Sequence, residues 1–173
     1  MAAESILPAG PTTTAAAGRY VTFYLGHESY GVPVLKVREI IRILEITPVP
    51  NTPRFIKGVA NLRGKVIPVI DLRIRFALGD AAINERTCIV VMQVTLPSGN
   101  ENQMGFIVDA VAEVVALNAG DIEPRPDFGA ALDTRFIMGM AKVNKTVVTT
   151  LLDIDKVVDA ETVARVATLA PMA

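Results

Sequence analysis

The side chains that most often do chemistry are scarce and scattered in this sequence. Its 173 residues include one His, one Cys and no Trp. A single His excludes a metal cluster of several His ligands, and a Ser/His/Asp triad would have to use His27. His27 lies in a predicted turn, where a solvated side chain is expected, and Cys88 lies in an apolar run, where a small buried hydrophobe is expected. The sequence therefore predicts no catalytic residue, no metal site and no cofactor.

One pair of carboxylates has a structural interpretation. Asp153 and Asp155 lie close together after an apolar run, and Asp71 follows a similar run earlier in the chain. Asp often begins a helix, because its side chain accepts hydrogen bonds from the free backbone N–H groups of the first turn. We therefore expect Asp71 and Asp153 each to cap a short helical turn after a strand, and we expect the chain not to be an enzyme.

Strand-like runs dominate the elements that must position these residues. The chain is 51% hydrophobic and 5% aromatic, and its apolar runs are far shorter than the roughly 20 residues of a membrane-spanning helix. Short runs separated by turn residues favour an all-β fold of small barrels. The predicted strands are residues 20–25, 30–34, 58–63, 66–70, 87–94, 104–109, 111–117, 137–143 and 147–152. Only residues 159–170 have the pattern of an amphipathic helix.

Two segments of the first half recur in the second half in the same order. Gly31–Ile41 recurs as Gly105–Val115, with the Gly, two Val and one Glu identical. Phe55–Gly58 then recurs as Phe136–Gly139. The repeat predicts two similar β units, with each repeated glycine at a bulge, a tight bend or a close approach of two backbones.

The repeat also sets the predicted domain organisation. Residues 1–18, rich in Ala, Pro and Thr, lack the positive start and apolar core of a secretory signal, and we expect a disordered tail. Residues 19–168 are expected to form one domain, with subdomains at about 19–80 and 85–152 and a C-terminal helix at about 159–170. A single Cys suits a reducing compartment, so we expect a cytoplasmic protein.

A marked charge asymmetry underlies the formal net charge of -1. Residues 36–75 hold nine Lys or Arg and three Asp or Glu, whereas residues 97–161 hold five basic and eleven acidic residues. Attraction between the two units would explain this, and so would head-to-tail association with a partner of similar fold. The basic stretch also leaves open a nucleic-acid-binding barrel, although it lacks the interleaved aromatic residues of a single-strand binder.

The repeated segments carry a resemblance to a known family. Residues 23–26, 30–34 and 37–41, with the long segment 53–73 (PRFIKGVANLRGKVIPVIDLR), resemble the CheW family of chemotaxis coupling proteins. Residues 105–115 and 136–155 resemble the second half of that family, so the resemblance covers about residues 19–168. It implies an all-β fold with short helices: two SH3-like β-barrel subdomains and a C-terminal helix packed against them.

The resemblance also implies a function. Members of the family are non-catalytic adaptors that couple the cytoplasmic tips of methyl-accepting chemotaxis receptors to the regulatory domain of the histidine kinase CheA. The chain is therefore expected to be a cytoplasmic scaffold recruited to membrane-associated receptor arrays. No nucleic-acid partner and no direct insertion into the membrane are expected.

Specific positions of the family's receptor-coupling surface have counterparts here. They match Val34, Val37, Glu39, Gly58, Arg63 and Val114. Glu39 and Arg63 are expected to form an ion pair, which either serves receptor coupling or is purely structural. The three valines could equally be core residues. Gly58→Asp is expected to leave the fold largely intact and to weaken recruitment of the partners.

Kinase binding is expected at a different place. Ile43 and Ile46 follow the first repeated segment, and exposed isoleucines there would suit an apolar contact with the kinase. Burial of both side chains in the core is the alternative.

Overall fold

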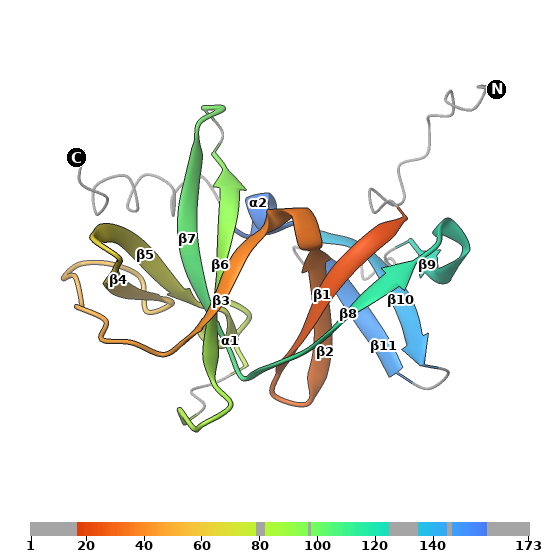
Figure 1. Ribbon diagram of the computed structural model, residues 1–173, viewed down its shortest axis with the longest axis horizontal. Helices are drawn as coiled ribbons and strands as arrows, with labels where there is room; N and C mark the ends of the chain where they lie inside the picture. Colours follow the sequence, from red (N-terminus) through yellow and green to blue (C-terminus); the bar gives the residue numbers. More distant parts are fainter. Residues whose placement is uncertain (1–16, 79–81, 97, 125–134, 145–146, 159–173) are drawn as a thin grey trace.

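Two β lobes lie side by side in the computed structural model (Figure 1), which describes residues 17–78, 82–96, 98–124, 135–144 and 147–158. The predicted C-terminal helix, residues 159–170, lies outside the described residues, as does the predicted tail except for its end. Gly18, predicted to end the tail, instead begins the first strand, where it pairs with Leu117.

Each lobe is built on one sheet. The six-stranded sheet has the order β8 (Ala110–Leu117), β1 (Gly18–Leu25), β2 (Glu28–Pro33), β11 (Val147–Leu152), β10 (Ile137–Asn144) and β9 (Ile122–Glu123). The five-stranded sheet has the order β3 (Val37–Arg42), β6 (Cys88–Thr95), β7 (Glu101–Val108), β5 (Lys65–Asp71) and β4 (Ile56–Leu62). The short helices are η2 (Val34–Lys36), α1 (Leu72–Arg75), η3 (Ala119–Asp121) and α2 (Ile154–Val157). The predicted all-β fold with two SH3-like subdomains is confirmed.

The strands do not follow the predicted subdomain ranges, and this part of the prediction is wrong. β1 and β2, assigned to residues 19–80, pair with β8 and β11 of the second range. β6 and β7, assigned to residues 85–152, pair with β3 and β5 of the first range. Strand pairing is long-range, so similarity between two halves of a sequence does not require each half to fold on itself. Within the described strands, the chain passes from one lobe to the other after β2 and again after β7 (Figure 1).

The first repeated segment marks these two crossings. The chain leaves the six-stranded sheet after β2 through η2, and it returns from the five-stranded sheet after β7 through Asp109. In both repeats the glycine lies opposite a parallel strand, Gly31 facing Leu151 and Gly105 facing Val69. A Cβ atom would lie 3.1 Å from the Leu151 side chain at Gly31 and 2.8 Å from Ile89 at Gly105. The nearest neighbours at both glycines are side chains, so the structure shows tight side-chain packing here and not the close approach of two backbones that was one of the predicted roles.

The second repeated segment also has the same structure in both lobes. The strand register shifts before Gly58 in β4 and before Gly139 in β10. Asp71 caps α1 by accepting a hydrogen bond from Arg73 N, at 2.9 Å. Asp153 caps α2 by accepting from Asp155 N, at 3.1 Å. The predicted caps are confirmed in both places.

The largest apolar cluster lies between the two sheets. Alternate residues of the central strands point in opposite directions, so that Val90 and Phe106 join this shared core while Ile89 and Ile107 face a smaller core inside the five-stranded lobe. The six-stranded lobe has its own small cluster around Leu151. Because the main core takes residues from both sheets, the lobes are joined by packing and not only by the chain.

Candidate functional site

An exposed leucine lies at the first crossing between the lobes. Leu35, the middle residue of η2, is 84% exposed, whereas its neighbours Val34 and Val37 pack partly against the shared core. The two valines are thus neither fully buried nor fully free, and they hold the turn that presents Leu35. Sequence reasoning missed Leu35, because the only local signal is its place in a short turn directly after Pro33, which ends β2.

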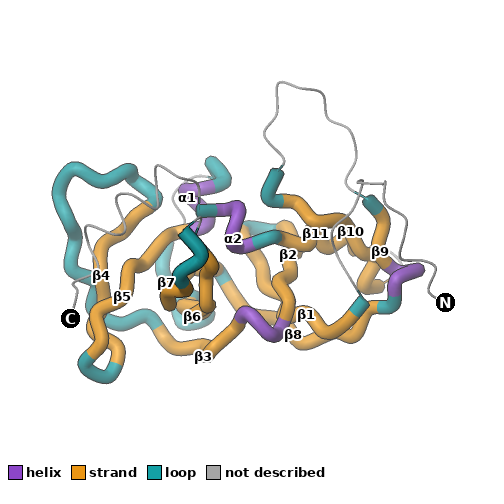
Figure 2. Tube along the Cα trace, turned by 90° about the horizontal axis from the view of Figure 1, so that it is seen from above, coloured by secondary structure: helices purple, strands orange, loops and turns teal. Residues whose placement is uncertain are grey.

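Val114 is another exposed apolar residue, at the edge of the six-stranded sheet. It is 54% exposed on β8 and pairs with Val21, whose side chain is buried in the shared core. β3, η2 and β8 lie on the same face of the molecule in both views (Figures 1 and 2). Val34 and Leu35 thus belong to η2 at the first crossing, Val37 begins β3, and Val114 belongs to β8 on the same side of the molecule (Figures 1 and 2). We call these four residues the inter-lobe apolar surface.

The predicted ion pair of Glu39 and Arg63 is confirmed. Arg63 lies in the tight turn between β4 and β5, and one of its guanidinium nitrogens donates to Glu39 on β3. This hydrogen bond raises the pKa of the Arg63 guanidinium, and the charge of Glu39 adds to the shift. The Arg63 side chain is 69% exposed, so the pair leaves donors facing solvent.

Gly58 has a structural role that the sequence did not predict. It is buried, its φ angle is 141°, and a Cβ atom there would lie 2.0 Å from the carbonyl oxygen of Thr47. Thr47 and Val59 exchange two backbone hydrogen bonds of 2.8 and 2.9 Å at this point. A side chain cannot be added without displacing the Thr47–Pro48 backbone. The expectation that Gly58→Asp leaves the fold largely intact is therefore wrong.

Ile43 and Ile46 line a groove on the five-stranded lobe. Both side chains are half-buried against the core of that lobe. One part of each side chain packs in the core and another part is exposed, so neither exposure nor burial alone describes them. The groove has a volume of about 430 Å³ and a largely apolar lining that includes Ile83, which is 58% exposed. Arg54 and Lys57 also line it. We call it the Ile43 groove.

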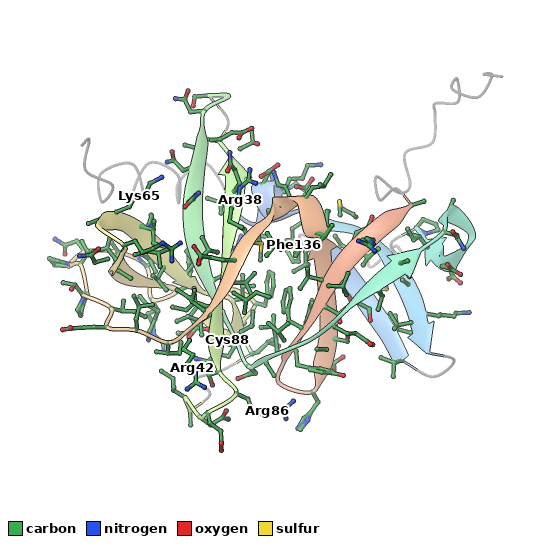
Figure 3. The ribbon with its side chains drawn as sticks, in the orientation of Figure 1. Arg38, Arg42, Lys65, Arg86, Cys88 and Phe136 are labelled. Atoms are coloured by element: carbon green, nitrogen blue, oxygen red, sulfur yellow. The ribbon has the colours of Figure 1, made fainter. Side chains whose placement is uncertain are left out.

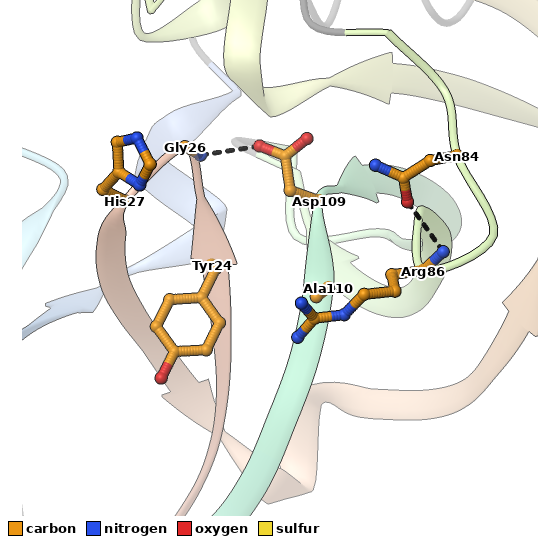
Figure 4. Close-up of a pocket in the computed structure, with 7 residues that line it drawn as sticks. All are labelled: Tyr24, Gly26, His27, Asn84, Arg86, Asp109 and Ala110. Carbon is orange, nitrogen blue, oxygen red and sulfur yellow. Dashed lines mark hydrogen bonds between the residues drawn. The ribbon is translucent and has the colours of Figure 1, made fainter.

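A second cavity, with a mixed polar and apolar lining, lies beside the second crossing (Figure 4). It has a volume of about 570 Å³ and includes His27, Arg86 and Asp109 in its lining. The Asp109 carboxylate accepts hydrogen bonds from Gly26 N at 2.6 Å and from the Arg73 guanidinium at 2.9 Å. It is thus engaged in structural contacts, and His27 is exposed in the turn where the sequence placed it.

The remaining reactive groups do not assemble into a catalytic site in the described part of the chain. Cys88 is half-buried, and burial raises the pKa of its thiol, which disfavours the nucleophilic thiolate. No group of three His, Cys, Asp or Glu side chains among the described residues could hold a metal ion. No helix of the described part is long and apolar enough to cross a membrane.

The charge asymmetry is partly neutralised within the molecule. Lys36 pairs with Asp155 at 3.0 Å, and Arg73 pairs with Asp109 at 2.9 Å, each joining the basic stretch to the acidic one. These contacts support attraction between the two stretches. Of the labelled cations, Arg38 and Lys65 lie toward the upper end of the five-stranded lobe and Arg42 and Arg86 toward its lower end (Figure 3), which does not favour a single phosphate-binding track.

Two separate apolar surfaces on a firmly joined pair of β lobes define a protein-interaction module. The CheW-like domain model matches residues 19–162, and the chain belongs to this family. It is 37% identical over 147 residues to the chemotaxis protein CheW of Klebsiella aerogenes, covering 85% of each chain. It is 33% identical over 125 residues to protein FrzA of Myxococcus xanthus, covering 72% of this chain and 74% of that one.

A solved structure agrees with this family. The scaffolding protein TtCheW of Thermoanaerobacter tengcongensis superposes with a TM-score of 0.73 at 34% identity, covering 84% of this chain and 95% of that one. Together the family and the fold identify the chain as an adaptor or scaffold of chemotaxis signalling.

Proposed function

We propose that this chain couples chemoreceptors to the histidine kinase CheA by binding both, without catalysing a reaction. In this role it is a cytoplasmic adaptor that joins membrane-associated receptor arrays through its partners. The observation that carries the proposal is the separation of two apolar surfaces, the inter-lobe apolar surface and the Ile43 groove, on one body with a shared core.

The inter-lobe apolar surface is the proposed receptor site. A leucine that is 84% exposed is unfavourable in water and suits an anchor that becomes buried on binding. The Glu39–Arg63 pair adds a held guanidinium whose remaining donors can bond a polar group of the receptor tip. Gly58 contributes indirectly, because it fixes the Thr47–Pro48 backbone against β4.

The Ile43 groove is the proposed kinase site. Its lining combines apolar residues, including Ile43, Ile46 and Ile83, with the cationic side chains of Arg54 and Lys57. Such a lining suits an apolar segment of the kinase regulatory domain that carries acidic residues beside it.

The test of both sites is reconstitution of kinase control from receptor signalling fragments, CheA and this chain. Leu35→Ala is expected to weaken binding of the receptor fragment by about 1–2 kcal/mol, because a buried anchor is lost. Ile83→Ser is expected to weaken binding of the kinase regulatory domain, since it removes apolar surface from the groove rim. Each variant should leave the other partner's affinity unchanged.

Val148 supplies the matched control. It is 52% exposed on β11, outside both surfaces, so Val148→Ala and Val148→Ser should bind both partners normally. Kinase activity that follows receptor ligand equally well with and without the chain would contradict the proposed function. Retention on heparin or an oligonucleotide at physiological salt would instead favour the nucleic-acid alternative.

A further inference from the structure

Both crossings between the lobes are held by charged side chains. At the second crossing the Arg73 guanidinium donates to both Asp71 oxygens at 2.9 Å and to Asp109 at 2.9 Å. Asp109 is the residue between β7 and β8, and its other oxygen accepts from Gly26 N in the β1–β2 turn. We call this set the Arg73 clamp. It joins the end of β5 in one lobe to the β1–β2 turn of the other.

A second clamp holds the first crossing. Lys36, the last residue of η2, contacts both oxygens of Asp155 at 3.0 and 3.1 Å. The Asp155 carboxylate also accepts a hydrogen bond of 2.8 Å from Thr95 N, at the end of β6. Asp155 belongs to α2, directly after the six-stranded sheet, whereas Thr95 belongs to the five-stranded sheet. We call this set the Lys36 clamp, and it ties η2 to both lobes.

The two clamps use the same structural position with opposite charge. Arg73 lies two residues after the capping Asp71, and Asp155 lies two residues after the capping Asp153. In one lobe this position is a cation that binds an anion at the crossing. In the other it is an anion that binds a cation at the crossing. Each crossing therefore has an ion pair that uses this position, but the charge at the position is positive in one lobe and negative in the other.

The clamps differ in exposure to solvent. The side chains of Arg73 and Asp109 are 4% and 18% exposed, whereas those of Lys36 and Asp155 are 26% and 30% exposed. Water and salt screen a partly exposed ion pair much more than a buried one. Opening the Arg73 clamp would also take one of two carboxylate partners from a guanidinium that is 4% exposed, which is costly. The Arg73 clamp is therefore firm and the Lys36 clamp is weak.

We propose that the Lys36 clamp is an adjustable contact that positions η2, and with it Leu35, between the lobes, while the Arg73 clamp keeps the second crossing fixed. Lys36 follows Leu35 directly, so release of Lys36 from Asp155 removes one restraint on the turn while Val34 and Val37 stay packed against the shared core. The link to receptor binding rests on the proposed function of the inter-lobe apolar surface. Lys36 and Asp155 are then positioning residues.

The rate of amide hydrogen exchange in the isolated chain can be measured separately for each clamp. The Val37 amide donates to Val34 O across η2, the Thr95 amide to Asp155, and the Gly26 amide to Asp109. Lys36→Met keeps the side-chain stem and removes the charge. We expect it to speed exchange of the Val37 amide by about two- to fivefold, the range set by loss of a partly exposed ion pair. The exchange rate of the Gly26 amide should not change.

Two further variants separate the ion pair from the backbone contact. Asp155→Asn keeps an oxygen that can accept the hydrogen bond from Thr95 N but removes the charge. It should therefore speed exchange of the Val37 amide as Lys36→Met does, and it should leave exchange of the Thr95 amide unchanged. Asp155→Ala should speed exchange at both amides. Arg38→Met is the matched control, because Arg38 is a neighbouring cation whose side chain bonds Gln93 instead. Raising salt from about 0.05 to about 0.5 M should mimic Lys36→Met in the unmodified chain only.

Each outcome decides the proposal. Unchanged Val37 exchange in Lys36→Met, or an equal change at Gly26, would overturn the adjustable clamp. Weaker binding of the receptor signalling fragment by Lys36→Met, with kinase-domain affinity unchanged, supports the positioning role, and unchanged receptor affinity overturns it. If the unmodified chain does not bind the receptor fragment at all, the proposed function fails, whereas the exchange result on the clamp still stands.

Discussion

At the scale of single residues, backbone geometry and exposure determine what each candidate position can do. Gly58 and Arg63 were both matched to a receptor-coupling surface, but Gly58 is buried against the Thr47 carbonyl whereas Arg63 extends into solvent. Leu35 had no role assigned from the sequence, and it is the most exposed of the large apolar side chains described. Gly58 thus supports the fold, whereas Arg63 and Leu35 are accessible for the partner contacts proposed above.

Gly58→Ala tests the supporting role. The added Cβ would overlap the Thr47 carbonyl, and the φ angle of 141° is unfavourable for any side chain, so we expect a loss of about 2–4 kcal/mol in the free energy of unfolding. Urea unfolding followed by circular dichroism measures it. Gly120→Ala is the control, because a Cβ there meets no atom within 4 Å. A Gly58→Ala protein as stable as the unmodified chain would disprove the backbone contact.

Arg63→Ala tests the role in contact. An exposed ion pair contributes little to stability, so the fold should be nearly unchanged. Receptor control of the kinase should nevertheless weaken, because the guanidinium held by Glu39 is lost. Kinase activity in reconstituted arrays, measured with and without receptor ligand, checks this. Normal control by a correctly folded Arg63→Ala protein would leave the pair with a structural role only.

At the scale of elements, local sequence signals found most strands but not their partners. The hairpin of β6 and β7 follows from two apolar runs around a Pro-Ser-Gly-Asn turn, and the structure has it there. β3 was not predicted as a strand, because it alternates charged with apolar residues at a sheet edge. The interleaving of the two sheets could not be predicted, since strand pairing between distant segments leaves no local pattern. For the same reason the sequence named Val34 and Val37 but could not say that Leu35 projects between them.

Asp71 and Asp153 cap equivalent helices, but we expect their loss to lower the free energy of unfolding by different amounts. Asp153→Ala removes an N-cap and should cost about 1 kcal/mol of unfolding free energy. Asp71→Ala also leaves the Arg73 guanidinium, 4% exposed, without its bidentate partner, so we expect a loss of about 3–5 kcal/mol. Chemical unfolding of the two variants in parallel measures the difference. Equal losses of unfolding free energy in the two variants would mean that Asp109 or solvent stabilises the Arg73 guanidinium when Asp71 is absent.

At the scale of the whole molecule, the two lobes form a single packed body. The shared core takes side chains from both sheets, and an aromatic stack of Phe23, Tyr30, Phe76 and Phe136 runs between the lobes with ring centroids 4.9–6.2 Å apart. A receptor bound at η2 and a kinase bound at the Ile43 groove would therefore share one rigid framework. Any coupling between them is then a difference in binding free energy transmitted through this framework.

This arrangement predicts that the lobes unfold together. Phe106 is fully buried in the shared core, whereas a break confined to one lobe would leave that core exposed to water. Phe106→Ala should lower stability by about 3–5 kcal/mol and should shift the unfolding of both lobes equally. Amide signals from β4 and β10, followed separately in urea, report one lobe each and should give coincident midpoints. Separate midpoints, or a shift confined to β4, would show that the shared core does not join the lobes and that the adaptor has two independent parts.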